Sequence, residues 1–130
     1  MTVFDWLVLS AGLYFANILL QDVFGVMNHD MKALFGTRDG FEPKGVGLKR
    51  TQRAQANFTE AMAMFVPLAL VAQLSGKAEG LATAGAAVFF WSRLAYLIAY
   101  VAGVPVVRSI VWMIGVVGLL MIFWAVAHFR

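Results

Sequence analysis

Four stretches of predominantly apolar residues follow one another along this chain of 130 residues. A transmembrane α-helix needs about 20 such residues to cross the hydrocarbon core of a bilayer. The predicted spans cover about residues 3–27, 51–75, 78–102 and 106–127. With 62% hydrophobic and 13% charged residues, the chain lies outside the range of soluble domains, which are about half apolar and a quarter charged. The sequence therefore predicts an all-α integral membrane four-helix bundle of up-down topology, with residues 1–130 forming a single domain.

The composition also excludes several kinds of site. The chain has no cysteine and two histidines, so we expect no disulfide, no protein thiol nucleophile and no metal site. The net charge of +3 comes from only ten Lys and Arg residues, most of which lie in one loop or inside the apolar spans. Nucleic acid is therefore not an expected partner.

The distribution of basic residues predicts the orientation in the membrane. The connection from Asn28 to Arg50 carries five basic residues, whereas the short hairpin near Gly76 carries only Lys77. Since cytoplasmic loops are enriched in Lys and Arg, we expect the long loop to be cytoplasmic and both termini to lie on the opposite side. The first span has neither a basic leader nor a cleavage pattern, so we interpret it as retained. The short termini suit a bacterial inner membrane.

Small residues and one proline predict local features of the helices. Pro67 lies inside the second span, removes a helical hydrogen bond and is expected to kink that helix. Small residues in the last two spans predict close helix packing. These residues are Gly80, Ala84 and Ala87 in the third span and Gly115 and Gly118 in the fourth.

Polar side chains form narrow faces on three of the predicted helices. Arg53, Asn57 and Glu60 are spaced i, i+4, i+7 and so share one face of the second helix. The same periodicity places Arg93, Tyr96 and Tyr100 on one face of the third helix, and Arg108 and Ser109 begin the fourth. Ionisable residues at membrane depth are a functional-site hypothesis by default.

Depth predicts that two of these charges meet. Glu60 and Arg93 each lie about ten residues from the cytoplasmic end of their helix, or roughly 15 Å deep, so we expect them to form an ion pair. Arg53, Arg93 and Arg108 outnumber Glu60, and this surplus predicts an anionic ligand with carboxylates. The competing interpretation is that these residues only hold the bundle together, with Arg50 reaching the lipid headgroups.

The segment Arg53-Ala54-Gln55-Ala56-Asn57-Phe58-Thr59-Glu60 resembles the Arg-x-x-x-Asn-x-x-Glu signature of the MAPEG superfamily, the membrane-associated proteins of eicosanoid and glutathione metabolism. Arg93-Leu94-Ala95-Tyr96 with Tyr100, and Val107-Arg108-Ser109, resemble later motifs of the same family. The resemblance implies a MAPEG-like homotrimer that binds glutathione between neighbouring protomers. It therefore implies a membrane-bound glutathione-dependent transferase or peroxidase that acts on a lipophilic small-molecule substrate arriving through the membrane lipid.

The resemblance also implies individual roles. Seven residues would bind glutathione, namely Arg53, Gln55, Asn57, Glu60, Arg93, Tyr96 and Tyr100, with Gln55 reaching a neighbouring protomer. Arg108 would be the catalytic group that favours the glutathione thiolate, assisted by Ser109. The chain departs from some family members at Asn28-His29-Asp30, with Lys32 beyond, where they carry arginines, and at Ala61, where they carry a tyrosine.

Other residues have simpler interpretations. Trp6, Trp112 and Trp124 are typical of helix packing or headgroup anchoring. His29 is expected to be solvated, and His128 is interpreted as an interface residue.

Two further functions fit the same pattern. One is a non-catalytic accessory protein of the same fold that binds a lipid or glutathione. The other is a small proton-coupled exporter with Glu60 as its buried carboxylate, which the nearby arginines disfavour because they would keep Glu60 ionised.

Overall fold

The computed structural model describes residues 1–28 and 46–127, and four long helices make up nearly all of this part of the chain. They are α1 (Val3–Asn28), α3 (Val46–Leu74), α4 (Leu81–Ala102) and α5 (Pro105–Ala127). Each helix contains a segment of 20 to 23 residues that is long and apolar enough to cross a membrane. The prediction of an all-α membrane bundle of four helices is therefore confirmed.

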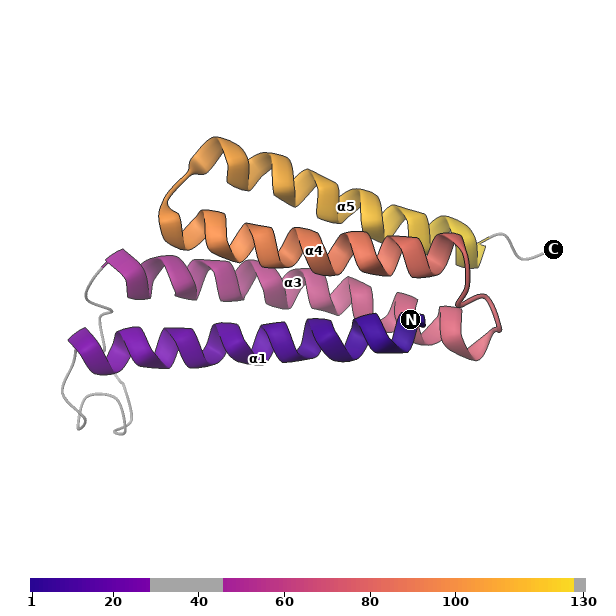
Figure 1. Cartoon of the computed structure of the whole chain (residues 1–130), viewed down its shortest axis with the longest axis horizontal. Coiled ribbons are helices and arrows are strands. Elements are labelled where there is room, and N and C mark those ends of the chain that lie inside the picture. Colours follow the sequence, from indigo (N-terminus) through magenta and orange to yellow (C-terminus); the bar gives the residue numbers. More distant parts are fainter. Residues whose placement is uncertain (29–45, 128–130) are drawn as a thin grey trace.

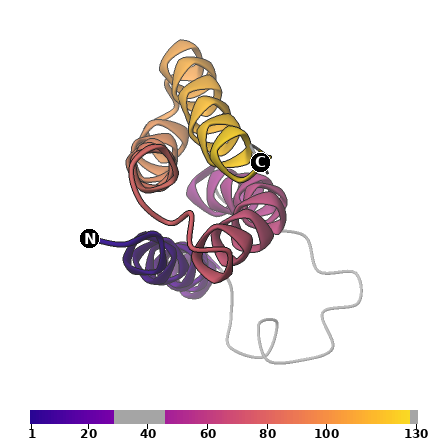
Figure 2. The same ribbon diagram turned by 90° about the vertical axis from the view of Figure 1, so that its right-hand side faces the viewer.

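The helices lie side by side and alternate in direction, as Figure 1 shows. The α4–α5 turn, the C-terminal end of α1 and the N-terminal end of α3 lie at one end of the bundle, and the α3–α4 connection lies at the other. Seen along the bundle in Figure 2, α1 and α3 form one pair, α4 and α5 form a second pair, and α3 lies between α1 and α5.

The first residues of α3 and α4 differ from the prediction, because hydropathy does not mark where a helix begins outside the lipid. α3 begins at Val46 rather than near Thr51, because a helix can extend past the lipid into its polar flank. α4 begins at Leu81 rather than near Ala78, after Gly76 and Gly80, which both have positive φ. At the other end of α4, Gly103 adopts φ 78°, a left-handed conformation that suits glycine. The Gly103 N–H donates to the Tyr100 carbonyl oxygen, and the Val104 N–H donates to the Ala99 carbonyl oxygen.

Glycines bring α4 and α5 into backbone contact. A Cβ atom on Gly85 would lie 2.6 Å from the carbonyl oxygen of Gly118, and one on Gly118 would lie 2.7 Å from the carbonyl oxygen of Gly85. A Cβ on Gly115 would lie 2.8 Å from Ser92 Oγ. The prediction of close packing through Gly115 and Gly118 is confirmed.

The small residues predicted for the third span are not the ones that make this contact. A Cβ atom on Gly80 would have no neighbour within 4 Å and Ala84 is exposed, whereas Gly85, Ala82 and Ala86 are buried. Small residues recur around most of this helix, so the sequence does not identify which face meets α5.

The main core contains buried side chains from all four helices, with an aromatic stack between α3 and α4. Phe65 and Phe89 stack with ring centroids 4.1 Å apart, and both are fully buried. α3 continues as a helix through Pro67, and the predicted kink there stays a prediction. Large apolar side chains such as Phe15, Ile98 and Phe123 are more than half exposed, which is the composition expected of surfaces that face lipid.

Candidate functional site

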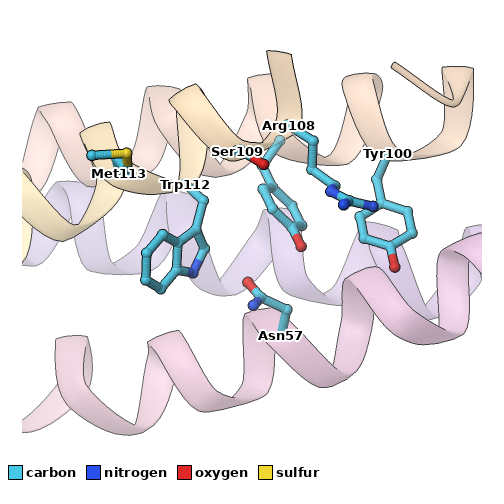
Figure 3. Close-up of a pocket in the computed structure, with 7 residues that line it drawn as sticks. Asn57, Tyr100, Arg108, Ser109, Trp112 and Met113 are labelled. Carbon is cyan, nitrogen blue, oxygen red and sulfur yellow. The ribbon is translucent and has the colours of Figure 1, made fainter. Parts of the chain in front are cut away.

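The polar faces of α3, α4 and α5 line an open pocket of about 500 Å³ near the α4–α5 turn, which we call the outer cavity. In Figure 3, the side chains of Asn57, Tyr100, Arg108 and Trp112 extend into a common space between α3 and the other two helices. The lining residues of the outer cavity are Asn57, Tyr96, Tyr100, Arg108, Ser109, Trp112 and Met113. Arg108 is the only charged residue among them, so the cavity carries a positive charge.

Arg108 is fixed by its position in the first turn of α5 and by one aromatic ring. Its backbone N–H donates to the carbonyl oxygen of Val104 at 3.1 Å, and its guanidinium carbon lies 4.9 Å from the centre of the Tyr100 ring. The Tyr96 and Tyr100 rings lie 5.5 Å apart, so the two tyrosines and Arg108 form one continuous wall. Both the fixed charge and the helix N-terminus favour an anion on this wall.

Arg93 lies behind the outer cavity and is 3% exposed. Its Nη1 donates to Asn57 Oδ1 at 2.9 Å, and its guanidinium carbon lies 4.3 Å from the centre of the Tyr96 ring and 4.8 Å from that of Phe58. Its Nε and Nη2 are buried without a hydrogen-bond partner within residues 1–28 and 46–127. Arg93 therefore orients Asn57 toward the outer cavity and keeps two donors unused.

The predicted ion pair between Glu60 and Arg93 is not among the contacts of the described residues. Arg93 pairs with Asn57 instead, because the amide oxygen one turn earlier on α3 is within reach of Nη1. Glu60 and Arg93 nevertheless line the same small cavity of about 90 Å³, which we call the inner cavity. The similar depth of Glu60 and Arg93 thus predicts that they are neighbours, but it does not predict that Arg93 donates to Asn57.

A third cavity, of about 220 Å³, gathers three guanidinium groups at the end of the bundle. Arg50, Arg53 and Arg108 line it with Tyr100 and the α4–α5 turn, and no carboxylate is among its described lining residues. We call it the arginine cavity. It shares Tyr100 and Arg108 with the outer cavity, so positive charge continues from one cavity into the next.

Eight of the nine predicted site residues line one of these three adjoining cavities. The exception is Gln55, whose Oε1 atom is buried without a hydrogen-bond partner in the described part of the chain. Arg53 and Glu60 are both exposed on α3. His29, Asp30, Lys32 and His128 lie outside the described residues, and so does most of the predicted cytoplasmic loop.

Sequence reasoning missed Trp112 as part of the site. The indole lines both the outer and the inner cavity, whereas the sequence predicts only a packing or anchoring residue. Trp112 follows Arg108 by four residues and therefore shares its helical face, which is the signal that identifies it. Met113 was missed as well.

A comparison with protein families identifies a family for this chain. The model of the MAPEG family matches residues 5–128, which is nearly the whole chain. Among curated proteins, none matches the chain by sequence.

Proposed function

This chain belongs to the MAPEG family, and we propose that it is a glutathione-dependent transferase or peroxidase acting on a lipophilic electrophile or hydroperoxide. Membership of this family supports a function in membrane glutathione or eicosanoid metabolism in general terms. The observation that carries the more specific proposal is the convergence of Asn57, Tyr96, Tyr100, Arg108 and Ser109 on one cavity.

The residues present fit glutathione in size and charge. The outer cavity, at about 500 Å³, lies within the range of about 300 to 1,000 Å³ typical of small-molecule sites. Glutathione carries two carboxylates, and Arg53 lines the adjoining arginine cavity, where its guanidinium group can bind a carboxylate through paired hydrogen bonds. Tyr96, Tyr100 and Asn57 offer neutral hydrogen-bonding groups beside them.

Glutathione, when bound, supplies a thiol whose anion is the reactive nucleophile, and a free thiol has a pKa of about 8.5. Arg108 favours the thiolate because its charge and the N-terminus of α5 both stabilise an anion. The Ser109 hydroxyl lines the same cavity and can donate a hydrogen bond to the sulfur. Arg93 acts through Asn57, which it holds in place.

Two of the proposed ligand-binding residues support a homotrimer. Arg53 and Glu60 are exposed on α3, and an unpaired charge that faces lipid is costly, by about 2.5 to 3.5 kcal/mol at the centre of the bilayer. A neighbouring protomer would cover them, and Gln55 would then contribute to the neighbour's site. We further propose a bacterial inner membrane location, a role in detoxification, and a cytoplasmic position for residues 28–50, with both termini on the opposite side.

The test is glutathione binding in detergent by calorimetry, followed by turnover of a generic aromatic electrophile and of an organic hydroperoxide. For Arg108→Ala we expect binding to be retained and turnover to fall about 100-fold or more, because the variant loses the charge that favours the anion. Lys49→Ala is the matched control, since Lys49 is an exposed cation of α3 that lines none of the three cavities.

Three results would contradict this proposal. Unchanged turnover in Arg108→Ala would remove Arg108 from the mechanism. Glutathione binding without turnover of either substrate would favour the non-catalytic accessory protein. Proton-dependent dye efflux from vesicles that is lost in Glu60→Gln would favour the exporter.

A further inference from the structure

A further pocket, open and of about 690 Å³, lies at the end of the bundle away from the arginine cavity. It lies between the N-terminal ends of α1 and α4, which Figure 1 shows at the same end as the α3–α4 connection. We call it the α1–α4 pocket. Its lining residues are Met1, Thr2, Trp6, Ala78, Glu79, Gly80, Thr83, Ala84 and Ala87. None of them lines the outer, inner or arginine cavity, so the pocket is separate from the proposed glutathione site.

The floor of the α1–α4 pocket is a row of small residues on α4. Gly80, Ala84 and Ala87 are the small residues of the third predicted span, and all three line this pocket. A Cβ atom on Gly80 would have no neighbour within 4 Å, and Ala84 is exposed, so the space above them is open. Such a floor leaves room for an acyl chain along α4.

The pocket lies at the level where two membrane spans begin. The apolar spans of α1 and α4 start at Val3 and Leu81, and Glu79 precedes the second span by two residues. Trp6 lies near the start of α1, and tryptophan is enriched at the interface between membrane and water. In a membrane, lipid headgroups lie beside the pocket, with their acyl chains directed toward Ala84 and Ala87.

Glu79 gives the pocket a negative charge. It is the only charged side chain among the described lining residues, and it is exposed. No hydrogen bond or ion pair of its carboxylate is found within residues 1–28 and 46–127. The nearest cation along the chain, Lys77, reaches α5, where its Nζ donates to the Val126 carbonyl oxygen at 3.4 Å. The pocket therefore favours a cationic group.

The hydroxyl groups of the pocket select a cation that donates hydrogen bonds. Thr83 Oγ1 donates to the Ala78 carbonyl oxygen, and Thr2 Oγ1 donates to Asp5 Oδ2 at 3.2 Å. Each hydroxyl hydrogen is thus already used, and Thr83 Oγ1 can only accept. A primary ammonium has three N–H donors for such acceptors, whereas a quaternary ammonium has none. The Trp6 indole N–H is the remaining side-chain donor, and it suits an anionic oxygen.

We propose that the α1–α4 pocket binds a zwitterionic phospholipid whose headgroup ends in a primary ammonium. Glu79 and Thr83 accept hydrogen bonds from the ammonium, Trp6 donates to the phosphate, and an acyl chain lies along Ala84 and Ala87. This inference goes beyond the proposed function and does not rest on it, because the two sites share no residue.

The first test compares three phospholipids that differ only in the headgroup. Native mass spectrometry of the whole protein in detergent measures binding of phosphatidylethanolamine, phosphatidylcholine and phosphatidylglycerol with identical acyl chains. We expect the wild type to bind phosphatidylethanolamine about fivefold more tightly than either of the others, as expected for one partly exposed ion pair. In Glu79→Gln this preference over phosphatidylglycerol should disappear, because the amide carries no charge.

Asp22→Asn is the matched control for the lost carboxylate, because Asp22 is exposed on α1 and lines none of the four pockets. It should keep the preference of the wild type. Equal affinity of the wild type for phosphatidylethanolamine and phosphatidylglycerol would overturn the proposal, as would a preference that persists in Glu79→Gln. Phosphatidylcholine that binds as tightly as phosphatidylethanolamine would overturn the choice of a primary ammonium.

The second test locates the lipid on α4. Ala84→Leu fills the floor of the pocket and should weaken phosphatidylethanolamine binding about tenfold. Ala95→Leu is the control, since Ala95 is exposed on the same helix and lines none of the four pockets. Equal binding by these two variants would place the lipid elsewhere and overturn the proposal.

The third test addresses Trp6. Trp6→Phe keeps an aromatic ring and removes the N–H, so it should weaken binding of all three phospholipids by about threefold, because each has the phosphate. Trp124→Phe, an exposed tryptophan of α5, is the control and should bind like the wild type. Unchanged binding in Trp6→Phe, or a loss confined to phosphatidylethanolamine, would overturn the assignment of Trp6 to the phosphate.

Discussion

The bundle contains two helix pairs that are held together in different ways. α4 and α5 meet through glycines, and their backbones touch at Gly85 and Gly118. α1 and α3 meet through larger side chains, including a hydrogen bond of 2.7 Å between Tyr14 Oη and Thr59 Oγ1. In a membrane, small residues allow close van der Waals packing, while polar side chains supply hydrogen bonds between helices.

The polar pair is the less completely satisfied of the two. Ser10 and Asn17 of α1 are fully buried, and none of their side-chain polar atoms has a hydrogen-bond partner in residues 1–28 and 46–127. In the described part of the glycine pair, the buried side-chain atoms without a partner are Arg93 Nε and Nη2, whereas Ser92 Oγ donates to the Phe89 carbonyl oxygen. Close packing of α4 against α5 holds the helix that carries Arg108 and Trp112. The outer and inner cavities lie between this helix pair and α3.

The largest expected effect comes from breaking the glycine contact. Gly118→Leu places a side chain against the Gly85 carbonyl oxygen and the Phe89 amide nitrogen, and backbone atoms cannot turn aside. We expect a loss of about 3 kcal/mol in the free energy of unfolding, the upper end of the range for overpacking. Unfolding in mixed micelles, followed by circular dichroism, measures it.

Val117→Leu is the control for this prediction, because Val117 is the exposed neighbour on α5 and should tolerate the change. If both variants unfold at the same denaturant concentration, close contact at Gly118 contributes nothing particular to stability.

A smaller effect is expected from replacing the buried amide of Asn17. Leucine has the same number of side-chain heavy atoms in the same branched arrangement and no polar atoms, so Asn17→Leu removes an unsatisfied group and should stabilise the protein by about 1 kcal/mol. The same micelle titration measures the change. A destabilised variant would indicate that Asn17 binds an ordered internal water molecule.

The smallest expected effect concerns the Tyr14–Thr59 hydrogen bond. Tyr14→Phe should lower the free energy of unfolding by about 0.6 kcal/mol, the average for interhelical hydrogen bonds in a membrane protein. A double-mutant cycle with Thr59→Val isolates this contact. A coupling energy near zero would mean that side-chain packing alone joins α1 to α3.

Much of this arrangement could be predicted from the sequence because lipid imposes simple rules. The length and hydropathy of the four spans required four helices, and helical periodicity placed Arg53, Asn57 and Glu60 on one face. Periodicity cannot say how far a helix continues beyond the lipid, so the start of α3 at Val46 was missed.

Partner choice within the site could not be predicted for a similar reason. Depth along the helices brought Glu60 and Arg93 to the same level, but side-chain reach decided that Arg93 donates to Asn57. The stacking of its guanidinium on Phe58 and Tyr96 likewise depends on the rotation of α3 and α4 about their axes, which apolar spans leave undetermined.

The contact between Arg50 and Gly103 has a consequence for how the site admits a ligand. A Cβ atom on Gly103 would lie 2.7 Å from Nη1 of Arg50, so the Arg50 side chain of α3 packs directly against the turn that precedes Arg108. This contact, together with the glycines between α4 and α5, restrains the end of the bundle that carries Arg108. The outer cavity is lined by Trp112 and Met113, which are both exposed, so a ligand dissolved in the lipid can reach it from the side of the bundle.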